Sequence, residues 1–223
     1  MAAERASDRA YERVLERILD LRLPPGTFVN EQALAADLGL GRMPVRESLA
    51  RLATDRLITV LPRRGTVVTP LGLTDVLDMF EAREAIECGV AHIAATRARP
   101  EDLATLRTLI SAADSGRDSV EYEKFLHADH EVHRFLVHMV GNPLLQDAAD
   151  RLLLHSIRFW RSYWASRPPQ IEAMMSHADL LAALEEHNPE QAEKAMRGHL
   201  RTSRQLVQSL FQDRTGPLFP QEI

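Results

Sequence analysis

The sequence of residues 30–52 is NEQALAADLGLGRMPVRESLARL, and this stretch decides the fold of the first third of the chain. Asn30 precedes a short segment with helical apolar spacing that ends at Gly39, so a short helix capped by the Asn30 side chain is predicted. The next helix is expected to begin near Gly41, with Pro44 in its first turn, where proline is tolerated. Two helices in close succession are therefore predicted.

The second of these helices has two different faces. Val45, Leu49 and Leu52 recur at helical spacing and form its expected buried face. Arg42 and Arg46, and further along the helix Arg51, are expected to project elsewhere. Arginine can bind guanine or phosphate through two parallel N–H groups, so an exposed pair on one helix favours a DNA-contacting surface.

The flanking segments complete a small domain. Ser7 is expected to cap an upstream helix that ends in the turn Pro24-Pro25-Gly26. After residue 56 the apolar period changes from 3.6 to 2, and 57–61 and 66–68 are predicted as strands joined by the turn at 62–65. Three helices followed by a basic hairpin predict a winged helix-turn-helix. The basic residues of the hairpin tip are Arg63 and Arg64.

Charge and composition separate the two halves of the chain. The 223 residues carry a net charge of −5, but residues 1–74 hold 11 arginines against nine acidic residues, and all nine histidines lie beyond residue 91. No apolar run approaches the length of a membrane span and no secretory signal is recognised at the N-terminus, so neither membrane insertion nor export is expected. Cys88 is the single cysteine, which excludes an intrachain disulfide and fits a cytoplasmic protein.

The remainder of the chain shows helical spacing and no strand pattern. An antiparallel all-α helical bundle with short connections is predicted, so the fold class is mainly α. The expected domains are a winged helix-turn-helix over 1–70, a helical domain over 71–212 and a loose tail over 213–223. The helices are expected to start near Thr74, Pro100, Ser119, Pro143, the Pro168-Pro169 pair and Pro189.

Four residues of the bundle form a candidate metal site. Asp129 and His133 are four residues apart, so both project from one face of a helix and can share a metal ion. His177 and His199 lie on later segments among apolar residues. A single histidine in such a place is more often a surface or hydrogen-bonded core residue, but together the four offer one carboxylate and three imidazoles.

The segment from Asn30 to Leu52, with the basic hairpin, resembles the DNA-binding domain of GntR-family bacterial transcription regulators. Their pattern Ser-Arg-Thr-Pro-Val-Arg-Glu-Ala-Leu is matched here at Arg42, Pro44, Val45, Arg46, Glu47 and Leu49. The resemblance implies that the operator is contacted by the first turn of the recognition helix and by the wing. Gly41 stands where Ser or Thr caps that helix, and Met43 replaces Thr, which is expected to alter operator preference. The implied DNA-binding residues are Arg42, Met43, Pro44, Arg46, Arg63, Arg64 and Gly65.

The second half resembles the FCD ligand-binding domain of the FadR subfamily. The family pattern of Asp-x-x-x-His, Asn after Gly, and two later histidines is matched by Asp129/His133, Gly141-Asn142, His177 and Ala192-Glu-Lys-Ala-Met-Arg-Gly-His199-Leu. The resemblance implies a divalent metal, such as Zn²⁺, Ni²⁺ or Mn²⁺, and a small organic acid as effector. The implied metal ligands are Asp129, His133, His177 and His199.

Three further residues are candidates for effector binding. Arg83 lies in the family's Arg-x-x-x-Glu pattern with Glu87 and could bind a carboxylate through both of its outer nitrogens. Its alternative role is a helix-surface salt bridge to Glu87. Asn142 follows the family pattern, and His155, with Arg158 nearby, could line the cavity.

The expected function is that of a bacterial ligand-responsive transcription regulator, acting as a repressor. A homodimer would bind a palindromic double-stranded operator, and a small carboxylate would modulate that binding. One alternative is a DNA-binding regulator whose metal is purely structural. The other is a metal-dependent enzyme, but the sequence offers no motif for a general base, so the chain is not expected to be an enzyme.

Overall fold

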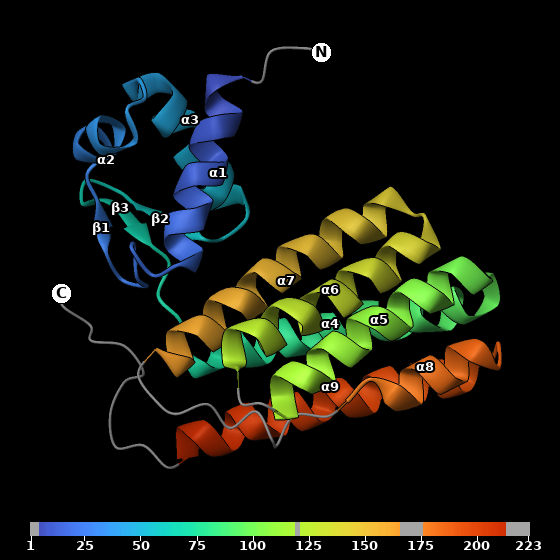
Figure 1. Ribbon diagram of the computed structural model, residues 1–223. Helices are drawn as coiled ribbons and strands as arrows, with labels where there is room; N and C mark the ends of the chain where they lie inside the picture. Colours follow the sequence, from blue (N-terminus) through green and yellow to red (C-terminus); the bar gives the residue numbers. More distant parts are fainter. Residues whose placement is uncertain (1–4, 119–120, 166–175, 213–223) are drawn as a thin grey trace. The chain divides into compact units, whose positions relative to one another are not determined.

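The computed structural model describes residues 5–118, 121–165 and 176–212. Within these residues the chain forms two compact units, one of 5–72 with the short stretch 161–165, and one of 73–118, 121–160 and 176–212 (Figure 1). The elements of the first unit are α1 (Ala6–Leu19), β1 (Phe28–Val29), α2 (Glu31–Leu38), α3 (Arg42–Thr54), β2 (Ile58–Leu61) and β3 (Gly65–Val68). Those of the second are α4 (Leu73–Arg97), α5 (Pro100–Asp118), α6 (Tyr122–Val140), α7 (Pro143–Trp164), α8 (Ala178–Glu185) and α9 (Pro189–Gln212).

The first unit is organised around α3, which packs against α1 and α2. The Asn30 side chain accepts hydrogen bonds from the backbone N–H groups of Gln32 and Ala33, which confirms the predicted cap of α2. Gly39 ends α2 in the left-handed conformation. The core of this unit includes Val14, Ile18, Leu34, Val45, Leu49, Leu52, Leu57 and Val68. The winged helix-turn-helix predicted from the sequence is therefore confirmed.

The sheet is antiparallel with the strand order β1-β3-β2. The β2–β3 hairpin was predicted, and its register pairs Ile58 with Val68 and Leu61 with Gly65. Strand β1 was not predicted, because two residues are too short to show a period of two. It is held instead by tertiary contacts, in which Phe28 pairs with Val67.

The predicted ends of the first helix are wrong. Helix α1 begins at Ala6 with Arg5 at its N-cap, and no side chain caps it. Ser7 therefore lies inside the first turn instead of preceding it. The helix also ends at Leu19, before the Pro24-Pro25 turn, and Leu21 then adopts a φ of 59°.

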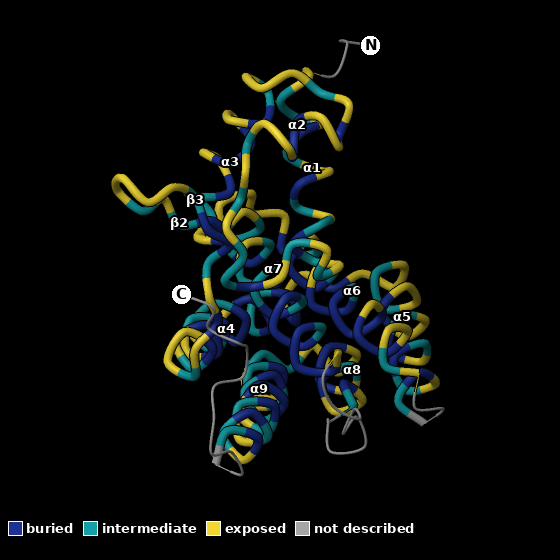
Figure 2. The backbone as a smooth tube through the Cα atoms, turned by 90° about the vertical axis from the view of Figure 1, so that its left-hand side faces the viewer, coloured by how far each residue is buried: buried dark blue, intermediate teal, exposed yellow. Residues whose placement is uncertain are grey.

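The second unit is the predicted all-helical bundle. Helix α9 packs along α4, α5 packs against α6, and α8 contacts α4, α5 and α9. Figure 2 shows buried residues on the sides of the helices that face other helices. Helices α5 and α6 approach each other closely at Gly116, where a Cβ would lie 2.7 Å from the backbone nitrogen of Phe125. Glycine at this position permits that approach.

The breaks between α6 and α7 and between α8 and α9 were predicted correctly. Gly141 ends α6 with a φ of 66°, and the Asn142 side chain caps the start of α7. Helix α8 begins at Ala178, so His177 is its N-cap residue and does not lie within the helix that was expected to start near the Pro168-Pro169 pair. The segment after Pro168-Pro169, through residue 175, and the tail predicted for 213–223 lie outside the described residues.

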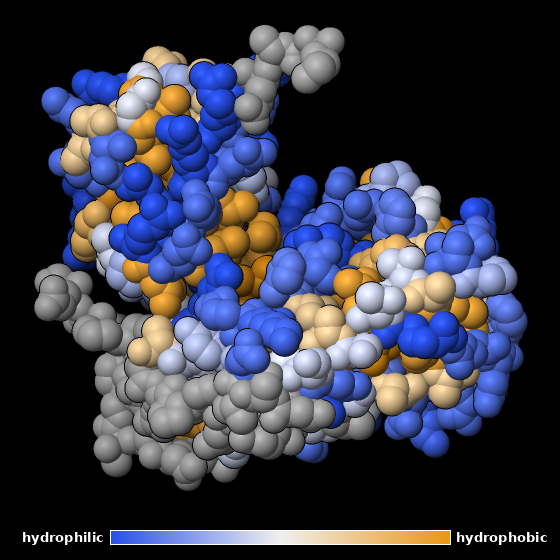
Figure 3. Space-filling view, in the orientation of Figure 1, coloured by the Kyte–Doolittle hydropathy of each residue, from blue (hydrophilic) through white to orange (hydrophobic). Residues whose placement is uncertain are grey.

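The face of the bundle drawn in Figure 3 is mostly polar. On the face drawn in Figure 3, hydrophilic residues predominate over the helical unit and the apolar patches between them are small. Over the described ranges, no helix combines the length and apolar character needed to cross a membrane.

Cys88 is expected to be chemically inert in the folded protein. It is 2% exposed within the core of the bundle, and burial raises the pKa of its thiol to about 11. At pH 8 about one thiol in a thousand would be ionised, and only the thiolate is nucleophilic. A disulfide-exchange reagent monitored by absorbance should therefore react at least about 100-fold more slowly with the native chain than with the denaturant-unfolded chain. Rapid stoichiometric labelling of the native chain would contradict the described core.

Candidate metal centre and DNA-binding surface

The first turn of α3 presents the side chains predicted to contact DNA. Arg42 and Arg46 are exposed, Met43 is 62% exposed, and Pro44 is partly buried. The apolar residues on the opposite side of α3 are buried in the core of the unit. Burial of that side holds the arginine-bearing side outward, which is the arrangement that a recognition helix requires.

The β2–β3 hairpin ends in a tight turn with a basic tip. Arg63, Arg64 and Gly65 are exposed, and the backbone N–H of Arg64 donates to the Leu61 carbonyl at 3.1 Å. Gly65 has a φ of 105°, a value that other L-residues adopt only with strain. Glycine is therefore needed for the shape of the wing, quite apart from any contact with DNA.

Arg51, on the same helix as Arg46, has a structural partner. Its NH1 donates to Asp8 Oδ1 at 2.7 Å, and its guanidinium lies 4.2 Å from the centre of the Tyr11 ring. Both partners are on α1. Arg51 therefore joins α3 to α1, whereas Arg42 and Arg46 lie on the exposed first turns of α3.

The structure brings the four candidate metal ligands together in the bundle. Asp129 and His133 come from α6, His177 from the start of α8 and His199 from α9. One potential ligand atom from each lies within 4.8 Å of all the others, and every one of the four residues is at most 4% exposed. Residues up to 70 positions apart in sequence thus converge on one point.

The imidazole Nε2 atoms face one another and the carboxylate. Nε2 of His133 and Nε2 of His177 are 3.2 Å apart. Asp129 Oδ1 lies 3.8 Å from Nε2 of His177 and 3.9 Å from Nε2 of His199, and it is buried without a hydrogen-bond partner. A buried carboxylate oxygen without a donor is costly. A cation between these atoms would remove that cost.

Burial favours the neutral forms of Asp129 and His177. It raises the pKa of Asp129, which the positive charges of His133 and Arg83 offset only in part. Burial also lowers the pKa of His177 well below its ordinary value, and repulsion from His199 and His133 adds to this. Neutral imidazole is the form that binds a metal ion.

A buried ion pair supports the cluster from α4. Arg83 Nε lies 2.6 Å from Glu87 Oε1, and Glu87 Oε2 lies 2.6 Å from His133 Nδ1. The Nδ1–H direction is not well aligned with that oxygen, so the contact with His133 acts mainly through charge. Burial alone raises the pKa of Glu87, but Arg83 and His133 outweigh it and hold the pKa far below its ordinary value.

Two further buried residues extend this ion pair to α7. Ser156 Oγ accepts a hydrogen bond from Arg83 NH1 at 3.1 Å and lies 3.2 Å from His130 Nε2. His130 Nδ1 lies 2.6 Å from the Leu126 carbonyl oxygen. The sequence did not identify Ser156, because nothing in the local pattern of α7 distinguishes it from other small residues. His130 follows Asp129 directly on α6, but its Nε2 points to Ser156 on α7 instead of to the ligands.

Both halves of the chain match known families. Residues 6–68 match the model described as bacterial regulatory proteins of the gntR family, and residues 78–202 match the FCD domain. The chain belongs to the GntR family of transcription regulators.

Named relatives and a solved structure agree with the membership of the GntR family. The chain is 26% identical over 193 residues to the HTH-type transcriptional repressor RspR of Escherichia coli strain K12, covering 86% of this chain and 84% of the relative. It is 30% identical to a probable D-xylose utilization operon transcriptional repressor of Paenarthrobacter nicotinovorans, covering 80% and 78% of the two chains. The structure of E. coli McbR/YncC has a similar fold, with a TM-score of 0.78 at 19% identity over 93% of this chain and 99% of that one.

The GntR-family chain is thus a DNA-binding transcription regulator and not an enzyme. This confirms the function class expected from the sequence. In the FCD domain the donor set of one carboxylate and three imidazoles fits a divalent transition-metal ion. The unpartnered Asp129 Oδ1 facing two Nε2 atoms is the observation that supports the fit.

The structure places the three predicted effector residues in different surroundings. Arg83 is 2% exposed and is bound to Glu87 and Ser156, so its predicted alternative of a surface salt bridge becomes a buried one. Asn142 is exposed and accepts hydrogen bonds from the backbone N–H groups of Leu144 and Leu145. His155 is partly buried on α7. Their roles toward an effector remain predictions.

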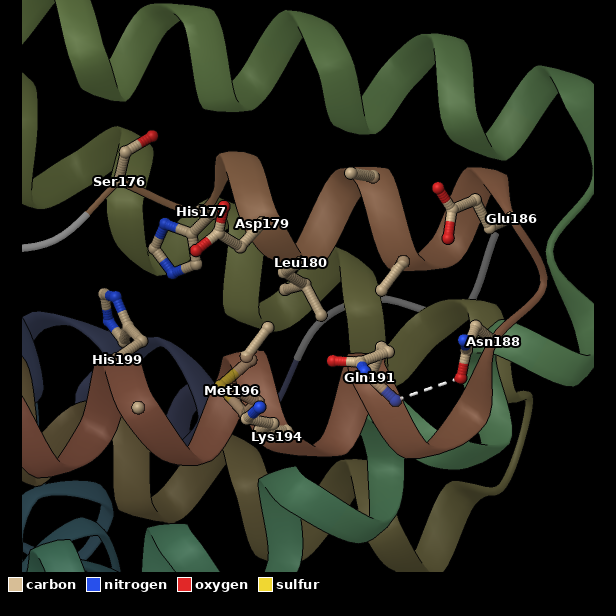
Figure 4. A pocket seen from close by; sticks show the side chains of 14 residues that line it. Ser176, His177, Asp179, Leu180, Glu186, Asn188, Gln191, Lys194, Met196 and His199 are labelled. Atoms are coloured by element: carbon tan, nitrogen blue, oxygen red, sulfur yellow. Dashed lines mark hydrogen bonds between the residues drawn. The ribbon is translucent and has the colours of Figure 1, made fainter.

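A groove of about 490 Å³ between α8 and α9 leads to the cluster in the FCD domain. Figure 4 shows His177 and His199 facing each other at one end, Leu180 and Met196 between the helices, and polar side chains at the other end. At that end Asn188 Oδ1 accepts a hydrogen bond from the backbone N–H of Gln191 at 3.1 Å. The sequence could not show this groove, because it depends on how far apart two helices pack.

The Asp129→Asn substitution should separate stability from metal binding. In the metal-free protein it replaces a buried carboxyl group, whose Oδ1 has no hydrogen-bond partner, with an amide whose N–H can donate to a neighbouring Nε2. We expect it to stabilise the metal-free chain by about 1 kcal/mol, or roughly 2–4 °C in melting temperature. It should also abolish any stabilisation by added divalent metal. A lower melting temperature for the metal-free variant, measured by calorimetry after chelation, would contradict this account of Asp129.

Proposed function

We propose that this chain is a metal-dependent, ligand-responsive repressor that acts as a homodimer on a palindromic operator. The observation that carries the proposal is the convergence of Asp129 and three imidazole Nε2 atoms within the regulatory domain of a DNA-binding protein. The first unit supplies the DNA contacts, and the second supplies the metal and effector sites. Repression is supported by the names of two relatives, which are described as repressors.

The DNA contacts proposed for the first unit are of two kinds. Arg42, Met43 and Arg46, with Pro44 setting the first turn of α3, would enter the major groove and contact bases. Arg63 and Arg64 would follow the phosphate backbone from the wing tip at Gly65. Two copies of the chain would place two such units on two half-sites, which is why the operator is expected to be palindromic.

The metal would be held by Asp129, His133, His177 and His199. Four protein ligands leave coordination positions for a small molecule when the ion is octahedral, as Mn²⁺ or Ni²⁺ can be. The ion would supply positive charge that attracts the carboxylate of an organic acid. Its removal would leave Asp129 as a buried charge without compensation.

The proposed effector is a small carboxylate that reaches the ion within the bundle. Arg83 uses three of its five N–H groups to bind Glu87 and Ser156. The other two N–H groups would donate to a ligand. The groove between α8 and α9 is the proposed route of entry, because it ends at His177 and His199. The effector acts only through a difference in its affinity for the DNA-binding and released states.

A regulator with a purely structural metal is the second candidate. The observation that favours it is that Arg83 already binds Glu87 and Ser156. These contacts use much of the hydrogen-bonding capacity of the guanidinium that is expected to bind the effector. In that case the metal would stabilise the bundle, and no small acid would change operator binding.

Arg46→Ala should weaken operator binding by about 10- to 100-fold, since a lost arginine–base contact costs about 1–3 kcal/mol. The operator can be obtained by repeated selection from random duplexes, and binding measured by fluorescence anisotropy at fixed salt. The matched control is Arg9→Ala, which removes the same charge at an exposed position of α1. This variant should bind the operator nearly as tightly as the wild type. Equal affinities for the two variants would remove Arg46 from the DNA interface.

A melting-temperature screen against small mono-, di- and hydroxy-carboxylates should distinguish the two candidates. A ligand that binds only the folded state at 100 times its dissociation constant stabilises by about 2.7 kcal/mol. We expect one acid class to raise the melting temperature only in metal-loaded protein, and His177→Ala to abolish that rise.

The control for this screen is His138→Ala, which removes an exposed imidazole from α6. It should retain both the metal and the response to the acid. Stabilisation by metal with no response to any acid in the wild type would instead favour the structural role.

A further inference from the structure

We propose that Glu87 is a positioning residue of the metal centre, which holds the His133 ring so that its Nε2 lone pair points at the ion while Arg83 balances the carboxylate charge. This inference rests on the proposed binding of a metal. It assigns a role to α4, a helix that contributes none of the four ligand atoms.

The contact between Glu87 and His133 decides which imidazole nitrogen carries the proton. Glu87 Oε2 lies 2.6 Å from His133 Nδ1, and an ionised carboxylate can only accept. Although the Nδ1–H direction is bent away from that oxygen, a negative charge this close favours the tautomer of His133 whose proton is on Nδ1. Nε2 is then the nitrogen with a free lone pair, and it is the atom that lies 3.2 Å from His177 Nε2 and 3.8 Å from Asp129 Oδ2.

The Arg83–Glu87 pair is better explained by this role than by stability. Both side chains are at most 3% exposed, and taking two charges out of water costs about as much as their attraction returns. Isolated buried pairs can often be replaced by apolar residues without loss of stability. Here, however, Glu87 has a second contact, with a proposed metal ligand, and an apolar pair would lose it.

Arg83 is itself fixed from three directions. It donates to Glu87 through Nε and NH2, at 2.6 Å and 3.3 Å, and to Ser156 through NH1. Its guanidinium also lies 5.8 Å from the centre of the Phe80 ring, within the range of a cation–π contact. A guanidinium held in this way keeps the Glu87 carboxylate in one orientation.

The proton positions along the rest of the network are consistent with this arrangement. Because the Leu126 carbonyl can only accept, His130 carries its proton on Nδ1 and accepts through Nε2 from the Ser156 hydroxyl. Ser156 can then accept from Arg83 at the same time. The hydrogen bonds thus lead from Arg83 through Ser156 and His130 to the Leu126 carbonyl of α6. Glu87 is the other acceptor of Arg83, and it faces His133.

The test measures Co²⁺ binding by competition with a chromophoric chelator, together with the visible spectrum of the bound ion. Carboxylates that orient metal-binding histidines contribute about 10- to 100-fold to affinity. We expect Glu87→Gln to weaken Co²⁺ binding by about tenfold and to change the spectrum. The control Glu131→Gln removes the same charge from a partly exposed pair with Arg134 on α6, and should leave both unchanged.

Two double variants separate positioning from folding. Arg83→Met/Glu87→Gln and Arg83→Met/Glu87→Met both remove the buried ion pair, so neither leaves a single charge in the core. They differ in whether an acceptor faces His133. We expect the second to bind Co²⁺ about tenfold more weakly than the first.

Nitrogen-15 NMR of the metal-free chains gives a readout that a purely structural role would not change. The His133 proton should reside on Nδ1 in the wild type and in Arg83→Met/Glu87→Gln, and be shared between both nitrogens in Arg83→Met/Glu87→Met. Equal Co²⁺ affinities and the same protonated nitrogen in all chains would overturn the role of Glu87. Absence of Co²⁺ binding by the wild type would instead overturn the proposed metal function, and the role of Glu87 with it.

Discussion

The burial of the Asp129 carboxylate beside three imidazoles is the constraint on which the helical domain depends. Although three imidazoles surround it, one oxygen of this carboxyl group has no hydrogen-bond donor. Such a group destabilises a bundle, and proteins retain groups of this kind at functional sites. A divalent cation would turn the cost into an attraction that joins α6, α8 and α9. In the proposed function the apolar core supplies stability, and the polar cluster at its centre would supply sensitivity to a ligand.

The same constraint explains why α4 carries charges into the core. This helix follows the last strand of the DNA-binding unit, since β3 ends at Val68 and α4 begins at Leu73. Through Arg83 and Glu87 it touches His133 on α6 and Ser156 on α7. In the proposed function, occupation of the centre would therefore bear on the helix that follows the DNA-binding unit in sequence. An effector shifts DNA binding only through a difference in its affinity for the DNA-binding and released states.

Features with a local physical cause could be predicted from the sequence. Asn30 caps α2 because its own side chain reaches N–H groups two and three residues ahead, and Gly141 ends α6 because its backbone can adopt a positive φ. The hairpin followed from a change of apolar period, and the outward arginines of α3 from the spacing of its apolar residues. Local reasoning failed at Ser7, where a suitable cap residue lies within the helix, and at β1, whose two residues are held only by pairing with β3.

The candidate metal centre shows which features the sequence determines and which depend on the tertiary structure. The sequence by itself determined the chemistry, with a carboxylate and an imidazole four residues apart on one helix and two later histidines in apolar surroundings. The tertiary structure decided that these four meet and that His177 does so from a helix N-cap. It also decided that Glu87, Ser156 and His130 surround them, and that Arg83 lies in the core and not on the surface. The physical reason is that spacing along a helix fixes which residues share a face, whereas the distance between helices depends on the packing of all the side chains between them.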